Sequence, residues 1–238
     1  MTLEAVLFDM FDTLLMIQGN HSFHLPAIKR MYEHVSTNGI SVSFEKFHST
    51  YITVRDKIIA ETDLNLDEPH FNLRVAETLK SLGYKYEVSD PIVKGATNAF
   101  AEEFMKYVCI DENAEKMLNT LNKKFRLGII SNFAIPECVH KLLNVNGINN
   151  MFEVVVISGE VNKRKPSPEI FTITLDKLGV PAEKVAFVGD TVDADVDGAK
   201  SVGMKSIYIK RRDQKFFKFH PDHIINSLSE LPVTLEQY

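Results

Sequence analysis

Five short apolar runs along the chain show no alternation with polar residues. Aliphatic runs of this kind are typical of strands covered on both faces, as in a buried parallel sheet. The runs are Ala5 to Phe8, Leu127 to Ile130, Val154 to Ile157, Val185 to Val188 and Ser206 to Ile209. The pattern therefore predicts a parallel sheet.

Segments with apolar residues at helical spacing separate the last four runs. They are Ile135 to Asn146, Pro168 to Leu178 and Asp193 to Val202, each followed by a glycine that can end a helix: Gly147, Gly179 and Gly203. Strands that alternate with helices predict a doubly wound α/β fold, in which a ligand binds at the carboxyl ends of the strands.

The stretch from about Ile17 to Cys109 breaks this alternation. It has apolar residues at three- and four-residue spacing and no convincing buried strand. Four helices are predicted there: Leu25 to Thr37, Phe44 to Glu61, Phe71 to Leu82 and Pro91 to Val108. We therefore predict a core of residues 1–16 and 110–238 and a helical domain of residues 17–109, inserted after the first strand. Such an insert lies over the strand ends as a lid, with predicted hinges at Ile17 to Asn20 and Cys109 to Glu112.

Composition narrows the class of protein. The 238 residues are 45% hydrophobic, enough for one large core or two modest ones, and 27 Lys and Arg against 32 Asp and Glu give a net charge of -5. Basic residues are scattered except in Lys210 to Lys218, which we expect to be a solvated loop, so no nucleic-acid or membrane partner is predicted. Cys109 and Cys138 are far apart, and the N-terminus lacks the features of a signal peptide, so a cytoplasmic protein is expected. The sequence leaves the oligomeric state open.

Polar residues follow several of the predicted strands. Asp9 follows the first strand, Ser131 and Asn132 the second, and Asp190 the fourth, while Lys165 precedes a helix. Because the carboxyl ends of parallel strands lie at one edge of a sheet, these side chains are expected to converge.

Four segments in this order resemble the motifs of the haloacid dehalogenase superfamily. They are FDMFDTL, IISN, KPSPEIF and GDTVDADVDGAKSVGM, and the helical insert looks like the first type of cap in that superfamily. The resemblance implies a Rossmann-like core with an all-helical cap, and a hydrolase acting on a small phosphorylated metabolite.

The resemblance also implies a role for each residue. Asp9 would attack phosphorus to form an aspartyl-phosphate. Mg²⁺ would be held by Asp9, the backbone carbonyl of Phe11 and Asp190, with Asp195 supporting the metal waters or Lys165. Lys165 would hold Asp9 and the phosphoryl oxygens, and Ser131 and the amide of Asn132 would donate to the phosphoryl group.

Phe11 departs from the commonest pattern of the superfamily. Most phosphatases that the chain resembles carry there a second Asp, which protonates the leaving alcohol and then activates water. Asp12 follows one residue later, where it could act as that acid or form a local hydrogen bond in the turn.

Two other functions stay open at this point. The L-2-haloacid dehalogenases of the superfamily also have an aromatic residue at the position of Phe11 and displace halide without a metal. Asp190 weighs against this activity, because without a metal its charge would repel the carboxylate of a haloacid. The third possibility is a catalytically impaired module that binds a phosphometabolite. We favour the phosphatase.

The insert also contains basic residues that could contact an anionic substrate, but the sequence pattern does not single out any of them: His21, His24, Arg30, Arg55, Lys57 and Arg74.

Overall fold

The centre of the molecule is a parallel sheet of six strands in the order β5-β4-β1-β6-β7-β8. The computed structural model describes residues 2–19, 22–215 and 218–238. The strands are β1 (Ala5–Phe8), β4 (Arg126–Ser131), β5 (Val154–Ile157), β6 (Val185–Gly189), β7 (Lys205–Ile209) and β8 (His223–Ile225). The predicted doubly wound fold is thus confirmed. Sequence analysis missed β8, an edge strand of three residues in which only Ile225 is buried.

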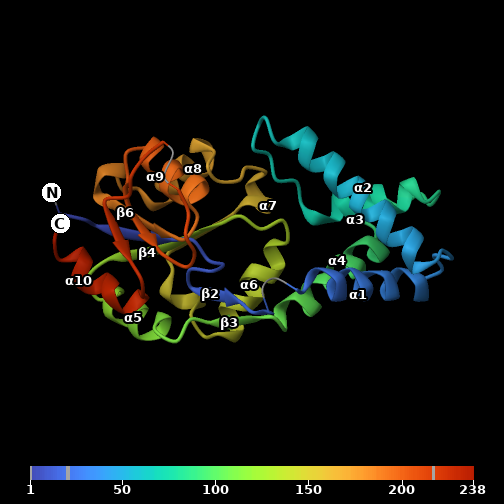
Figure 1. The fold of residues 1–238 in the computed structure, drawn as a ribbon, viewed down its shortest axis with the longest axis horizontal. Coiled ribbons are helices and arrows are strands. Elements are labelled where there is room, and N and C mark those ends of the chain that lie inside the picture. Colours follow the sequence, from blue (N-terminus) through green and yellow to red (C-terminus); the bar gives the residue numbers. More distant parts are fainter. Residues whose placement is uncertain (1, 20–21, 216–217) are drawn as a thin grey trace.

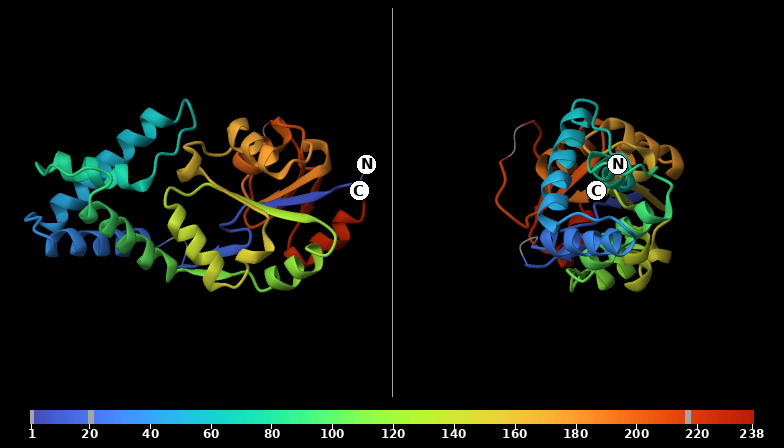
Figure 2. Two further views of the ribbon diagram at one scale, coloured as in Figure 1. Left: turned by 180° about the vertical axis from the view of Figure 1, so that it is seen from behind. Right: turned by 90° about the vertical axis from the view of Figure 1, so that its right-hand side faces the viewer.

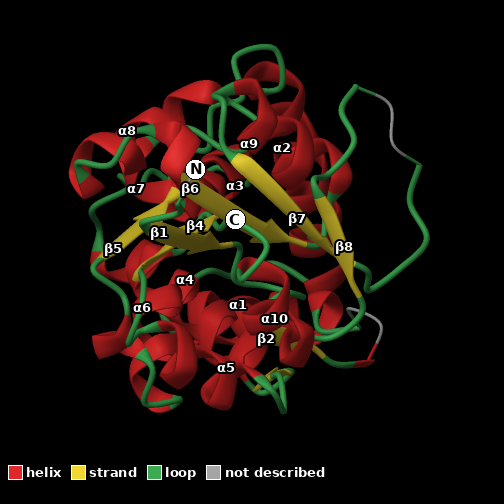
Figure 3. Cartoon of the chain, turned by 90° about the vertical axis from the view of Figure 1, so that its left-hand side faces the viewer, coloured by secondary structure: helices red, strands yellow, loops and turns green. Residues whose placement is uncertain are grey.

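Helices cover both faces of the sheet, as Figure 3 shows. One face carries α7 (Ser158–Val161), α8 (Pro168–Leu178) and α9 (Asp197–Ser201), and the other carries α5 (Ala114–Leu121), α6 (Pro136–Val145) and α10 (Leu231–Leu235). Helix α8 illustrates the local signals, because Ser167 caps its first turn by accepting a hydrogen bond from the Glu169 amide at 3.3 Å and Gly179 ends it at φ 65°. Covered on both faces, all four residues of β1 are buried.

Four further helices lie beyond the carboxyl ends of the strands. They are α1 (His24–Thr37), α2 (Phe44–Thr62), α3 (Phe71–Ser81) and α4 (Pro91–Met105). Figures 1 and 2 show them at one end of the molecule, with the two termini at the other. The four helices agree with the predicted ones, although α4 ends at Met105 rather than Val108, because the chain enters a strand there. The division into a core and a cap at residues 17 and 109 stays a prediction.

A two-stranded antiparallel ribbon joins these helices to the sheet. It pairs β2 (Leu15–Ile17) with β3 (Val108–Ile110), with Leu15 opposite Ile110. No buried strand was expected in this stretch, and in the ribbon only Leu15 is buried. The two strands themselves were not predicted, since segments of three residues are too short to show a period. Both predicted hinges include residues of the ribbon, and their bending stays a prediction; Asn20 and His21 lie outside the described residues.

The sheet order brings distant segments together at one edge. Strand β1 lies between β4 and β6, with Phe8 level with Ile129 and Val188. The residues that follow these three strands therefore emerge side by side, facing the helical insert (Figure 1). In the described parts of the chain, no helix has the length and apolar character needed to cross a bilayer.

Candidate active site

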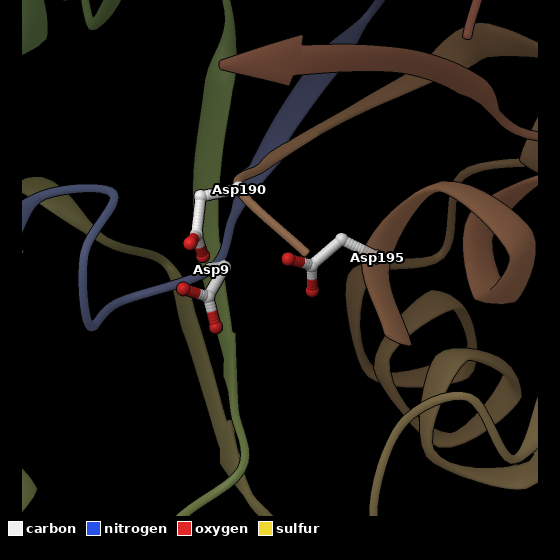
Figure 4. Close-up of side chains that lie close together, drawn as sticks. All are labelled: Asp9, Asp190 and Asp195. Atoms are coloured by element: carbon white, nitrogen blue, oxygen red, sulfur yellow. The ribbon is translucent and has the colours of Figure 1, made fainter. Parts of the chain in front are cut away.

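Three buried carboxylates gather at the ends of β1 and β6. Asp9 directly follows β1, Asp190 directly follows β6, and Asp195 lies one turn later, with exposed fractions of 8%, 2% and 2%. One carboxylate oxygen of each residue lies within 4.8 Å of the others. Figure 4 shows Asp9 and Asp190 next to each other, with Asp195 facing them. The structure thus brings these predicted residues together, and their roles stay predictions.

Lys165 is the cation inside this group of acids. Its Nζ atom donates to Asp9 Oδ1 at 2.5 Å and lies 2.8 Å from Asp195 Oδ1, and the residue is only 3% exposed. Asn132 fixes the backbone of Lys165 from both sides: its Oδ1 accepts from the Lys165 amide at 2.7 Å, and its Nδ2 donates to the Lys165 carbonyl at 2.9 Å. The side chain of Asn132 therefore positions Lys165, a contact that the sequence did not indicate.

Asp195 is held against the end of β6 by an unusual turn. Sequence analysis predicted one helix from Asp193 to Val202, but the chain first makes a wide π-helical turn over Val192–Val196. This turn lets the Thr191 amide donate to Asp195 Oδ2 at 2.9 Å. The carboxyl carbon of Asp195 lies 2.4 Å from where a Cβ atom on Gly189 would stand, so only glycine fits at that position. Lys165 and the Thr191 amide each contact one oxygen of Asp195, and its role beside the metal or Lys165 stays a prediction.

Ser131 ends β4 with an unsatisfied hydroxyl. It is fully buried, and its Oγ atom has no hydrogen-bond partner among the described residues. A buried hydroxyl without a partner is costly, and an oxygen-rich ligand would relieve that cost. The predicted donation to a phosphoryl group fits this geometry.

Burial and crowding perturb the charges of the site. Burial raises the pKa of Asp9 to about 6, with Lys165 opposing the shift and Asp195 adding to it. Burial and the charges of Asp9 and Asp195 raise the pKa of Asp190 to about 7, against the opposing charge of Arg212. Burial alone would lower the pKa of Lys165, but the Asp195 and Asp9 carboxylates raise it. The site therefore holds a charged lysine and an excess of negative charge.

The family is settled by comparison with known sequences. A family model described as haloacid dehalogenase-like hydrolase matches residues 3–203. The chain belongs to the haloacid dehalogenase-like hydrolases. The expected hydrolase is thereby confirmed.

Known members of this family are similar along almost the whole chain. A glyceraldehyde 3-phosphate phosphatase of Methanocaldococcus jannaschii is 27% identical over 234 residues, which cover 96% of this chain and 95% of that protein. The crystal structure of a haloacid dehalogenase-type phosphatase from Thermococcus onnurineus is 26% identical, with a TM-score of 0.67 and 98% of each chain covered. A 2-haloacid dehalogenase from Pseudomonas syringae pv. Tomato has a TM-score of 0.75 at 23% identity, with 99% of each chain covered, and this likeness shows the fold alone.

The donor set of this hydrolase fits a hard divalent cation. Asp9 and Asp190 offer carboxylate oxygens in a buried site, and one oxygen of each lies within 4.8 Å of the other. Oxygen ligands of this kind suit Mg²⁺, whose charge would balance the excess of carboxylates. Participation of the Phe11 carbonyl stays a prediction.

The segment after β7 reaches the site, which sequence analysis did not foresee. Arg212 Nη2 lies 3.0 Å from Asp190 Oδ2. Gln214 donates from Nε2 to the Asp190 carbonyl at 2.9 Å and accepts from the Val192 amide at 2.9 Å. The segment is a loop with exposed residues, as expected, but Arg212 and Gln214 also contact the site; residues 216 and 217 lie outside the described chain. Arg212 and Gln214 follow the carboxyl end of a predicted strand, and this position in the sequence could have indicated that they lie near the site.

Phe11 belongs to a cluster of aromatic rings that lines the same cavity as the carboxylates. Its ring centroid lies 4.8 Å from that of Phe133 and 5.4 Å from that of Phe104. Asp12 adopts φ 58° and accepts a hydrogen bond from the Ile17 amide at 3.1 Å, which is the local role considered for it. Aromatic rings and acids together line a cavity of about 240 Å³.

The raised carboxyl pKa values predict a pH-dependent stability of the metal-free protein. The folded-state values of about 6 and 7 for Asp9 and Asp190 exceed the ordinary 3.8, so the native state binds more protons than the unfolded state. Stability is therefore lost as pH rises. We expect the free energy of unfolding in EDTA to fall by at least about 1.4 kcal/mol between pH 5 and pH 8, measured by urea denaturation.

Asp190→Asn is the variant that isolates this effect. It removes the group with the higher pKa and should flatten the pH dependence, whereas Asp176→Asn, an exposed acid on α8, should leave it unchanged. The same slope in wild type and Asp190→Asn would contradict the electrostatic description of the site.

Proposed function

We propose that this hydrolase is a Mg²⁺-dependent phosphatase of small phosphorylated metabolites that acts through an aspartyl-phosphate on Asp9. The observation that carries the proposal is the buried group of Asp9, Asp190 and Asp195 around Lys165. Phosphatases among the similar proteins support the same reaction class.

In the first step a carboxylate oxygen of Asp9 attacks the phosphorus atom. A bond forms between that oxygen and phosphorus, and the bond between phosphorus and the substrate oxygen breaks. Lys165, which contacts Asp9 Oδ1, keeps the nucleophile in place and offers positive charge to the phosphoryl oxygens. Ser131 Oγ donates to one of these oxygens. Mg²⁺, when bound by Asp9 and Asp190, supplies the positive charge that lets an anion approach an anion.

The second step is attack by water on the phosphorus atom, which releases phosphate and restores the Asp9 carboxylate. The side chain of Phe11 cannot take up or deliver a proton, and Asp12 is engaged with the Ile17 amide. Both steps therefore proceed without strong general acid or base assistance, which is typically worth about 10² to 10⁴-fold in rate.

The aromatic residue at position 11 favours a second candidate, a metal-independent 2-haloacid dehalogenase. Halide leaves without a proton, so the lack of a proton donor at Phe11 would not slow that reaction. Against it, Asp190 is buried beside Asp9. Without a metal, its charge would repel the carboxylate of a haloacid.

The state of the cysteines supports a cytoplasmic location, which is part of the proposal. Cys109 and Cys138 are both free thiols, and burial raises the pKa of Cys138 to about 12. Free thiols are typical of proteins in a reducing compartment.

Metal-dependent turnover of p-nitrophenyl phosphate tests the reaction class. We expect hydrolysis with Mg²⁺, its loss in EDTA, and a fall to the uncatalysed background in Asp9→Asn, which has no carboxylate nucleophile. Asp176→Asn, on the exposed face of α8, serves as the matched control and should retain full turnover.

Chloride release from 2-chloropropionate, followed in parallel, separates the alternatives. Release without metal would replace the phosphatase by the dehalogenase. No turnover of either compound would leave the third possibility, a module that binds a phosphometabolite.

The absence of a proton donor at position 11 predicts a strong dependence on the leaving group. We expect kcat/KM for p-nitrophenyl phosphate to exceed that for propyl phosphate by about 10² to 10⁴-fold, because only the alkoxide needs a proton to leave. Asp12→Asn should keep this ratio. Similar rates for both esters would show that a donor is present, and a ratio that widens in Asp12→Asn would identify Asp12 as that donor.

A further inference from the structure

We propose that Arg74 of this hydrolase selects phosphate esters whose leaving group carries a carboxylate, bound in a second cavity beside the active site. The inference rests on the proposed phosphatase function and deepens it, because it names the chemical class of the substrate. It is carried by the surroundings of Arg74 in the helical insert.

The second cavity adjoins the cavity that contains Asp9. It has a volume of about 210 Å³ and shares Phe23, Asn132 and Phe133 with its neighbour. Together the two volumes fall within the usual range of small-molecule sites, about 300 to 1,000 Å³. A substrate with its phosphoryl group at Asp9 can therefore extend past the shared residues toward the insert.

Arg74 lines this second cavity with unused hydrogen-bond donors. Among the described residues its buried Nε atom has no hydrogen-bond partner, and none of their carboxylates forms an ion pair with its guanidinium group, although Glu68 is near enough to respond to its charge. The guanidinium carbon stands 5.0 Å over the ring centroid of Phe71, an arrangement that fixes the plane of the group and leaves its edges free. Half-buried arginine donors without partners are costly, and a bound acceptor would satisfy them.

Other arginines of the insert differ from Arg74 in this respect. Arg30 pairs with Glu33 at 2.6 Å, and Arg55, which also lines the second cavity, pairs with Asp56 at 2.7 Å. Arg74 is thus distinguished by the burial of its Nε atom and by the absence of an ion pair with any described residue.

Glu68 decides which anion fits best. This residue lines the same cavity, and burial raises the pKa of its carboxyl group despite the nearby charges of Arg164 and Arg74. A second phosphate would bring two negative charges next to Glu68, whereas a carboxylate brings one. A planar carboxylate also matches the paired donors of a guanidinium group. The leaving group is therefore a small organic acid.

Matched pairs of phosphate esters test this inference. The first pair is 3-phosphoglycerate and glycerol 3-phosphate. The second pair is 6-phosphogluconate and glucitol 6-phosphate, whose longer carbon chain places the carboxylate farther from the phosphoryl group. Within each pair the compounds differ in one carboxylate. We expect the acid to have the higher kcat/KM in at least one pair, by about 10- to 100-fold, the usual worth of a charge-assisted hydrogen bond.

Arg74→Met should reduce this ratio to about one, and Arg74→Lys, which keeps the charge, should restore part of it. Arg30→Met is the matched control, since Arg30 is 52% exposed on α1, and it should keep the wild-type ratio. Thermal unfolding verifies that each variant is folded. A wild-type ratio near one in both pairs, or a ratio that survives Arg74→Met, would overturn the proposal.

Binding measurements keep this test separate from the test of the reaction class. Failure to hydrolyse p-nitrophenyl phosphate would refute the phosphatase, whatever Arg74 does. In that event calorimetric titration with the same four compounds still decides the role of Arg74. Tighter binding of the acids that is lost in Arg74→Met supports it, and equal binding of acid and alcohol refutes it.

Discussion

The contact of one buried ammonium group with two carboxylates organises the active site. Lys165 Nζ touches both Asp9 and Asp195, and all three residues are almost completely buried. Charges are removed from water only at a large cost, which good geometry and further hydrogen bonds must offset. With Asp190 added, the site still has more negative than positive charge, and this imbalance is the physical reason to expect a divalent cation.

The fold supports this contact by tying together loops from distant parts of the chain. Arg211, on the segment after β7, donates to the Asp12 carbonyl at 3.0 Å and to Asp111 Oδ2 at 2.7 Å, next to the ribbon that leads to the insert. Immediately before Lys165, Lys163 pairs with Asp67 at 2.5 Å and Arg164 with Asp63 at 3.0 Å, both in the insert. One short segment therefore contacts the insert with two side chains and the nucleophile with the third.

Sequence patterns predicted most of the elements because strands buried on both faces consist of uninterrupted aliphatic runs, such as Ala5–Phe8, which are easily recognised in the sequence. The convergence of Asp9 and Asp190 could be expected from strand order alone. Strand β2 and its partner were missed because each has only three residues, of which only Leu15 is buried. Contacts such as Asn132 to Lys165 and Gln214 to Asp190 depend on residues more than twenty positions apart, so no local pattern indicates them. The distinction between Arg74 and the other arginines of the insert likewise depends on which of them forms an ion pair.

A crystal grown with Mn²⁺, which can replace Mg²⁺ and gives an anomalous signal, tests whether Asp9 and Asp190 bind one cation. We expect one strong anomalous peak in contact with carboxylate oxygens of both Asp9 and Asp190, which disappears in Asp190→Asn. A peak that touches only one of these residues, or no peak between them at a saturating Mn²⁺ concentration, would contradict this expectation.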